Sequence, residues 1–173
     1  MKLRISGIIN ESIVDGPGIR MTVFAQGCKR ACPGCHNPQT HDLDGGYEAD
    51  VSDIISAAKK NPLLRGLTFS GGEPFLQAAG FAELARLAHE AGLDVMAYTG
   101  YTIEEILEHE PGSGDGFRDL LSQADILVDG PFIMERRTLN APYRGSDNQR
   151  VINVAETLAR LPYTASFAAE RLP

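Results

Sequence analysis

The chain has 173 residues, of which 43% are hydrophobic and 23% charged, a composition typical of a globular protein that folds as one domain. Its 16 basic residues are outnumbered by 23 acidic ones, and the formal net charge of −7 argues against nucleic-acid binding. No apolar run approaches the roughly 20 residues that cross a membrane, and the N-terminal segment lacks the apolar stretch of a signal peptide. We therefore expect a cytoplasmic protein with no membrane partner.

The first half of the chain predicts two strands and two helices in alternation. Residues 19–27 place hydrophobic side chains at alternate positions, which is the period of a strand. Residues 51–62 have helical spacing, and residues 67–72 form a short apolar strand that two glycines end. A second helix is predicted over residues 76–92.

The second half continues the alternation. Residues 93–100 predict a strand, and Thr102 and Glu105 form a capping box at the start of the helix that follows. We expect a further helix that ends at Gln123. The last predicted elements are strands at 125–130 and 149–154 and a short helical tail within 155–173.

Strands that alternate with helices predict an α/β fold with a parallel sheet. No repeat or linker divides the chain, so we expect a single domain over residues 1–173, and the tail over 155–173 is given no function. Ligand-binding residues of parallel sheets lie at the carboxyl ends of the strands. Four predicted strands end in unusual residues, and we expect one active site there, formed by residues 28–35, 71–73, 98–100 and 129–131.

All three cysteines lie in one loop, GCKRACPGCHNP, at Cys28, Cys32 and Cys35. An odd number of cysteines so close together indicates metal or redox chemistry rather than a disulfide framework. Three thiolates suit an iron–sulfur cluster whose fourth iron stays open for another ligand.

Zinc is an alternative for the same loop, because three cysteines and one histidine form an accepted structural site. His36 is poorly placed as the fourth ligand, since it is adjacent to Cys35 and neighbouring side chains of an extended chain point to opposite sides. His41 or His89 could serve instead.

A second motif, Ser70-Gly71-Gly72-Glu73, ends a predicted strand. Its glycines allow the backbone to approach a ligand closely, and Glu73 offers an acceptor for an ammonium group. On its own, a pair of glycines after a strand indicates only a turn.

Two further polar residues are candidates for ligand binding. Asp129 ends an apolar strand, where a buried carboxylate needs a partner, and this partner is either a bound ligand or Arg150. Asn148 lies in the segment RGSDNQR, where Ser146, Asn148 and Gln149 offer neutral hydrogen-bonding groups suited to a ribose or a peptide backbone.

The C-x3-C-x2-C spacing resembles the cluster loop of radical S-adenosylmethionine enzymes. Together with DGPGIR, TFSGGEPF, YTGYTIEEIL, LVDGPF and RGSDNQRVI, it makes residues 10–154 similar to the activating proteins of anaerobic ribonucleoside-triphosphate reductases. The resemblance implies a partial TIM-type barrel of parallel strands, the radical SAM core. It also implies one [4Fe-4S] cluster on Cys28, Cys32 and Cys35, with S-adenosylmethionine chelated to the open iron.

The implied activity is reductive cleavage of S-adenosylmethionine to a 5′-deoxyadenosyl radical, which takes a hydrogen atom from a glycine of the large reductase subunit. A flavodoxin or ferredoxin is the implied electron donor. No catalytic residue is expected beyond the cluster and the cosubstrate. The residues expected to bind the cosubstrate are Ser70, Gly71, Gly72, Glu73, Asp129 and Asn148.

Two other functions remain open at this point. A radical enzyme that acts on a small molecule, similar to the deazapurine synthases, would share the cysteine loop and the glycine motif. A zinc-binding interaction module would share only the cysteines.

Overall fold

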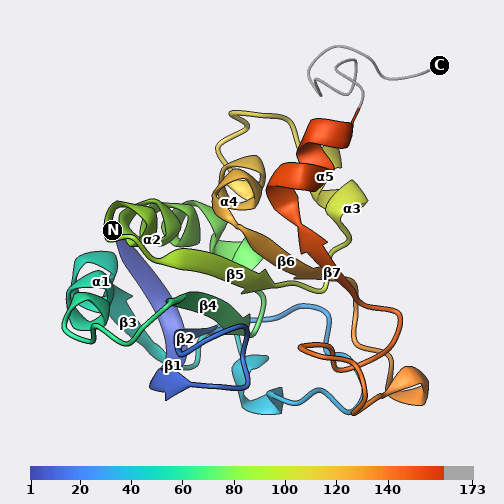
Figure 1. The fold of residues 1–173 in the computed structure, drawn as a ribbon. Helices are drawn as coiled ribbons and strands as arrows, with labels where there is room; N and C mark the ends of the chain where they lie inside the picture. Colours follow the sequence, from blue (N-terminus) through green and yellow to red (C-terminus); the bar gives the residue numbers. More distant parts are fainter. Residues whose placement is uncertain (162–173) are drawn as a thin grey trace.

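The computed structural model describes residues 1–161, which form one seven-stranded sheet with the order β3-β1-β2-β4-β5-β6-β7 (Figure 1). The strands are β1 (Lys2–Ser12), β2 (Arg20–Ala25), β3 (Tyr47–Asp50), β4 (Gly66–Gly71), β5 (Asp94–Tyr98), β6 (Ile126–Asp129) and β7 (Arg150–Asn153). The α-helices are α1 (Val51–Lys59), α2 (Ala78–Glu90), α3 (Ile103–Glu108), α4 (Phe117–Gln123) and α5 (Val154–Arg160). Short 3-10 turns are η1 (Pro38–Thr40), η2 (Pro74–Gln77) and η3 (Met134–Arg136).

The α/β class expected from the sequence is confirmed, but the sheet is parallel only in its centre. Strands β2, β4, β5 and β6 run parallel, whereas β1, β3 and β7 pair antiparallel with their neighbours. Residues 13–19, which join β1 to β2, are too few for the crossover of about a dozen residues that parallel neighbours need. The expectation of a parallel sheet therefore holds for the four central strands and fails at both edges.

The helices cover one face of the sheet, above it in Figure 1, and α2 packs between α1 and α4. Helix α2 directs Phe81, Leu84 and Ala85 into the core, where each is fully buried. The Phe81 ring lies 4.9 Å from the ring of Phe69 on β4, measured between centroids. Burial of this apolar face is what holds the helix layer on the sheet.

A buried cation fixes the loop between β1 and β2. The Arg20 side chain is fully buried, pairs with Asp94 at 2.6 Å between Nη1 and Oδ1, and donates from Nε to Thr68 Oγ1 at 2.7 Å. Thr68 in turn donates from its hydroxyl to the carbonyl of Asp15 at 2.8 Å. The loop containing Asp15 is thereby tied to the neighbouring strands.

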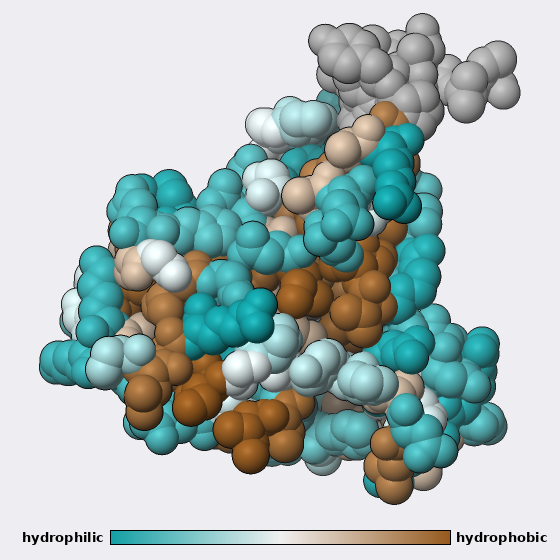
Figure 2. Space-filling model, viewed as in Figure 1, coloured by the Kyte–Doolittle hydropathy of each residue, from teal (hydrophilic) through white to brown (hydrophobic). Residues whose placement is uncertain are grey.

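Two long loops lie on the opposite side of the sheet from the helices, below it in Figure 1. They are residues 26–46 and 130–149. The loops contact each other through the rings of His36 and Phe132, whose centroids are 5.1 Å apart. On the face shown in Figure 2, hydrophobic residues are exposed in several separate patches among hydrophilic ones. Within residues 1–161, no helix is long and apolar enough to cross a membrane. Residues 162–173 of the expected tail lie outside the described residues.

Candidate functional site

A cavity of about 820 Å³ opens at the carboxyl ends of the central strands. This volume falls in the range of roughly 300–1,000 Å³ that is usual for ligand sites. Each of the four strand ends singled out in the sequence contributes to its lining, through Cys28 after β2, Gly72 after β4, Thr99 after β5 and Gly130 after β6. The structure therefore brings these separate segments together around one space.

The three cysteines are free thiols, partly exposed, and all line this cavity. The Cys35 N–H donates to the Cys32 carbonyl at 3.1 Å, and the Asn37 N–H lies 3.4 Å from the Cys35 sulfur. Left-handed backbone lets the loop turn back on itself and occurs at Gly27, Ala31 and Gly34. The chain thus presents three thiols to one space without burying them in the core.

The arrangement of donors bears on the choice between zinc and a cluster. In the part of the chain that the structure describes, no three His, Cys, Asp or Glu side chains form a group that could hold a single metal ion. His89, one of the suggested zinc ligands, lies on α2 and pairs with Asp125 at 2.9 Å. His41, the other suggested zinc ligand, lines the cavity together with the three cysteines. An iron–sulfur cluster does not require the three sulfur atoms to meet at a single ion, because each thiolate binds a different iron atom.

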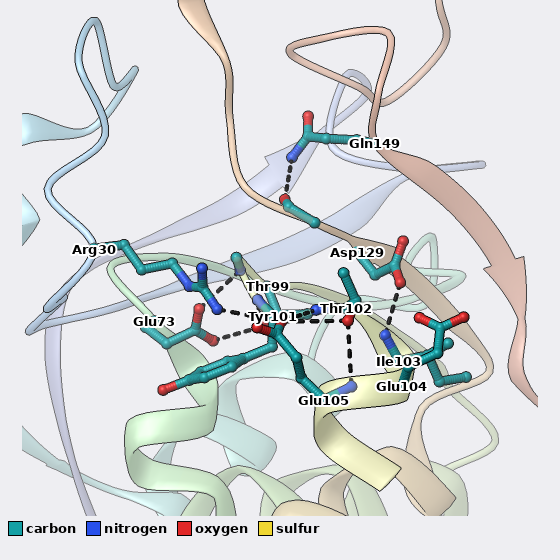
Figure 3. A network of polar contacts seen from close by, with 12 residues as sticks. Arg30, Glu73, Thr99, Tyr101, Thr102, Ile103, Glu104, Glu105, Asp129 and Gln149 are labelled. Atoms are coloured by element: carbon teal, nitrogen blue, oxygen red, sulfur yellow. Dashed lines mark hydrogen bonds and ion pairs between the residues drawn. The ribbon is translucent and has the colours of Figure 1, made fainter. Parts of the chain in front are cut away.

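Glu73 is a buried carboxylate at the centre of a hydrogen-bond network (Figure 3). Its Oε1 accepts from the Thr99 hydroxyl at 2.8 Å and the Phe75 N–H at 3.1 Å, and its Oε2 accepts from the Gly100 N–H at 2.8 Å. Burial raises the pKa of Glu73, and the hydrogen bonds from Gly100, Phe75 and Thr99 oppose that rise. A carboxylate has about four acceptor positions, so three internal donors leave room for one more.

The two glycines before Glu73 are required by the chain's own packing. A Cβ on Gly72 would lie 2.4 Å from the Gly27 carbonyl oxygen, and a Cβ on Gly71 would lie 2.7 Å from the Ala25 backbone. The Gly27 carbonyl also accepts from the Glu73 N–H at 2.8 Å. Close approach, which the sequence suggested for a ligand, is here an approach to the strand that leads into the cysteine loop.

Asp129 and Asn148 do not line the cavity. The Asp129 carboxylate pairs with Arg150, at 2.9 Å between Oδ1 and Nε, and accepts from the Ile103 N–H at 2.8 Å. Of the two partners considered for Asp129, the structure gives it Arg150. The Asn148 amide donates to the Pro131 carbonyl at 2.8 Å and so holds the segment that follows β6.

Arg30 lines the cavity but was not assigned a role from the sequence. Arg30 lies inside the cysteine loop, with its guanidinium carbon 4.4 Å from the centre of the Tyr101 ring. Gln149 accepts from the Gly145 N–H at 2.9 Å and donates to the Gly130 carbonyl at 3.0 Å. The position of Arg30 between two cysteines was the one available signal for it, whereas Gln149 was expected as a neutral hydrogen-bonding group of the segment RGSDNQR.

Comparisons with known proteins agree with this site. A family model described as a 4Fe-4S single cluster domain matches residues 14–152. The chain is 36% identical over 146 residues to the anaerobic ribonucleoside-triphosphate reductase-activating protein of Vibrio cholerae, which covers 79% of this chain and 89% of the relative. The chain belongs to the family of anaerobic ribonucleoside-triphosphate reductase-activating proteins. It is therefore an enzyme of the radical SAM type, as its motifs predicted.

Two more relatives support the assignment. The activating protein of the same name from Escherichia coli K12 is 30% identical over 148 residues, which is 80% of this chain and 91% of the relative. The pyruvate formate-lyase-activating enzyme of Clostridium pasteurianum is 38% identical over 115 residues, but this chain spans only 48% of it.

Proposed function

We propose that this enzyme activates an anaerobic ribonucleoside-triphosphate reductase by generating a glycyl radical on it. The observation that carries the proposal is the convergence of Cys28, Cys32, Cys35 and Glu73 on one cavity in a chain of this family. The names of the relatives support this class of partner, and the shared cavity supports this choice of residues.

The three cysteines are the proposed ligands of one [4Fe-4S] cluster. Thiolates are the standard ligands of such clusters, and three thiolates leave one iron free for S-adenosylmethionine. When bound and reduced, the cluster supplies the electron that cleaves S-adenosylmethionine to methionine and a 5′-deoxyadenosyl radical. Flavodoxin or ferredoxin is the electron donor that we propose.

The chain's own residues bind and orient the cosubstrate. Glu73 is the proposed acceptor for its ammonium group, since one acceptor position remains on a carboxylate held rigidly by Thr99 and Gly100. Ser70, Gly71 and Gly72 bring the end of β4 beside the cysteine loop. Asp129 and Asn148 support binding indirectly in this proposal, because they hold the ends of α3 and of the 130–149 loop in place.

The fold suits this chemistry. We infer a partial TIM-type barrel, the radical SAM core, in a single domain over residues 1–173. The support is the block of four parallel strands with helices on one face and the site at their carboxyl ends.

The proposal is tested with anaerobically reconstituted protein, dithionite and S-adenosylmethionine. With a reductase of this class present, we expect a glycyl signal in the electron paramagnetic resonance spectrum and transfer of deuterium from the labelled glycine into 5′-deoxyadenosine. Rapid turnover driven by a nucleotide-like small molecule, with no label transfer, would instead make the chain a small-molecule radical enzyme. Stoichiometric zinc without iron would exclude both radical functions.

A further inference from the structure

Arg30 lies between the first two cysteines and anchors this segment to residues outside the loop. Its guanidinium carbon lies 4.4 Å from the centre of the Tyr101 ring, and its Nη2 lies 3.4 Å from Glu105 Oε2. Figure 3 shows Arg30 reaching from the loop toward Tyr101, beside Glu73. The arginine thus joins the cysteine loop to the corner between β5 and α3.

The aliphatic part of the Arg30 side chain packs closely against the backbone of Gly100. A Cβ added to Gly100 would lie 2.3 Å from Arg30 Cδ, so the stem runs directly over the backbone at the end of β5. The Arg30 side chain is only 26% exposed. The Gly100 N–H, on the same short stretch of backbone, donates to Glu73. Arg30 and Glu73 therefore both bind to the Gly100 segment.

The acidic partner of Arg30 is oriented in advance by the start of helix α3. Glu105 Oε2 accepts from the Thr102 N–H at 2.7 Å, and the Glu105 N–H donates to the Thr102 hydroxyl at 3.2 Å, which is a capping box. The same oxygen, Oε2, faces Arg30. Because the cap already restricts Glu105, less conformational entropy is lost when Arg30 pairs with it.

These contacts differ from an ordinary surface ion pair. The ion pair alone contributes little, because Glu105 is 49% exposed and water screens it, as it screens Arg86 and Glu83 on α2. A guanidinium that stacks on an aromatic ring and is largely desolvated is held more strongly, and its planar shape suits both the ring face and the carboxylate.

We propose that Arg30 is a positioning residue that holds the cysteine loop on the β5–α3 corner before any metal is bound. Its role is to keep Cys28 and Cys32 at a fixed place relative to Glu73, so that a cluster and its cosubstrate meet the chain in one geometry. This inference goes beyond the proposed function because it concerns the metal-free chain.

Thiol labelling of the metal-free protein tests the inference directly. All three cysteines of the chain lie in the loop, so the labelling rate reports on the loop alone. In Arg30→Gln we expect labelling to be about fivefold faster, because the loop opens more often. Loss of positive charge by itself works the other way, since it raises thiol pKa values and slows labelling.

Lys29→Gln is the matched control, because it removes the same charge from an exposed neighbour in the same loop. It should label at the wild-type rate or more slowly. Glu105→Gln keeps the helix cap, because glutamine also completes a capping box, and should accelerate labelling more than Glu108→Gln, which removes the same charge from an exposed position on α3. Circular dichroism and thermal unfolding of each variant show whether the fold is intact.

A second readout separates positioning from a purely structural role. After reconstitution, the midpoint potential of the cluster should fall in Arg30→Gln and stay near wild type in Arg30→Lys, because a nearby positive charge favours the reduced state. Wild-type labelling in Arg30→Gln, or equal acceleration in Lys29→Gln, would overturn the inference. Neither result depends on radical chemistry, so the proposed function would stand.

Discussion

The hydroxyl of Thr99 donates a 2.8 Å hydrogen bond to Glu73 and so joins the ends of β5 and β4 above the core. Both side chains are almost fully buried, with 5% and 2% of their surface exposed. Glu73 is therefore a structural centre of the site as well as its proposed ligand-binding acceptor, and substitutions there must separate the two roles.

Glu73→Gln should retain the cluster and weaken S-adenosylmethionine binding by about 1.5–3 kcal/mol, because one charge-assisted hydrogen bond is lost. Glutamine keeps an acceptor for the Thr99 hydroxyl, so the fold is preserved better than in Glu73→Ala. Equilibrium binding to the reconstituted protein measures the effect, with Glu108→Gln on α3 as a control of equal charge. Unchanged affinity would leave Glu73 with a structural role only.

Replacing Cys28, Cys32 or Cys35 singly with Ala should abolish iron incorporation and all cleavage of S-adenosylmethionine. The helical content should stay close to wild type, because the loop lies outside the α-helices. Metal analysis, absorbance and circular dichroism on the same samples check both statements. A variant that turns over at the wild-type rate would show that the ligand set is misassigned.

The chemistry-bearing segments were readable from the sequence because each is a local pattern. The cysteine spacing, the two glycines before Glu73 and the capping box of Thr102 and Glu105 are all encoded within a few residues, and the capping box is confirmed. Helices α1 and α2 were predicted from apolar residues at helical spacing, α3 was predicted from its capping box, and the helix expected to end at Gln123 is α4.

Strands β1 and β3 were not predicted, for physical reasons that the structure makes clear, whereas the edge strand β7 was predicted at 149–154 and is confirmed. In β1, register shifts between Ile5 and Gly7 and between Ile9 and Ser12 interrupt the alternation by which a strand is recognised. In β3, the four residues Tyr47–Asp50 are polar or partly exposed and pair only because β1 lies beside them. The contacts of Arg30 with Tyr101 and Glu105 likewise join residues more than 70 positions apart, which no local pattern reveals.

Arg150→Ala should destabilise the fold without changing affinity for S-adenosylmethionine. It leaves the buried Asp129 carboxylate with the Ile103 N–H but without its cation, at a cost of about 1–3 kcal/mol, since the arginine itself is half exposed. Asp129→Asn in the same background should recover part of the loss. Chemical denaturation measures the free energy of unfolding, and titration with S-adenosylmethionine measures the affinity. Weaker binding at unchanged stability would indicate that Asp129 acts in cosubstrate binding.

Gly72→Ala should disturb the cysteine loop through a single added methyl group. That Cβ would lie 2.4 Å from the Gly27 carbonyl oxygen, which already accepts the Glu73 N–H, and backbone on both sides limits how far either atom can move. We expect a loss of about 1–3 kcal/mol in unfolding free energy and faster thiol labelling of the metal-free protein. Gly7→Ala is the control, because a Cβ at Gly7 meets no atom within 4 Å, and its stability should change by less than about 0.5 kcal/mol. If Gly72→Ala is as stable as Gly7→Ala, the close packing of β4 against the cysteine loop does not require glycine, and the motif is kept for its ligand.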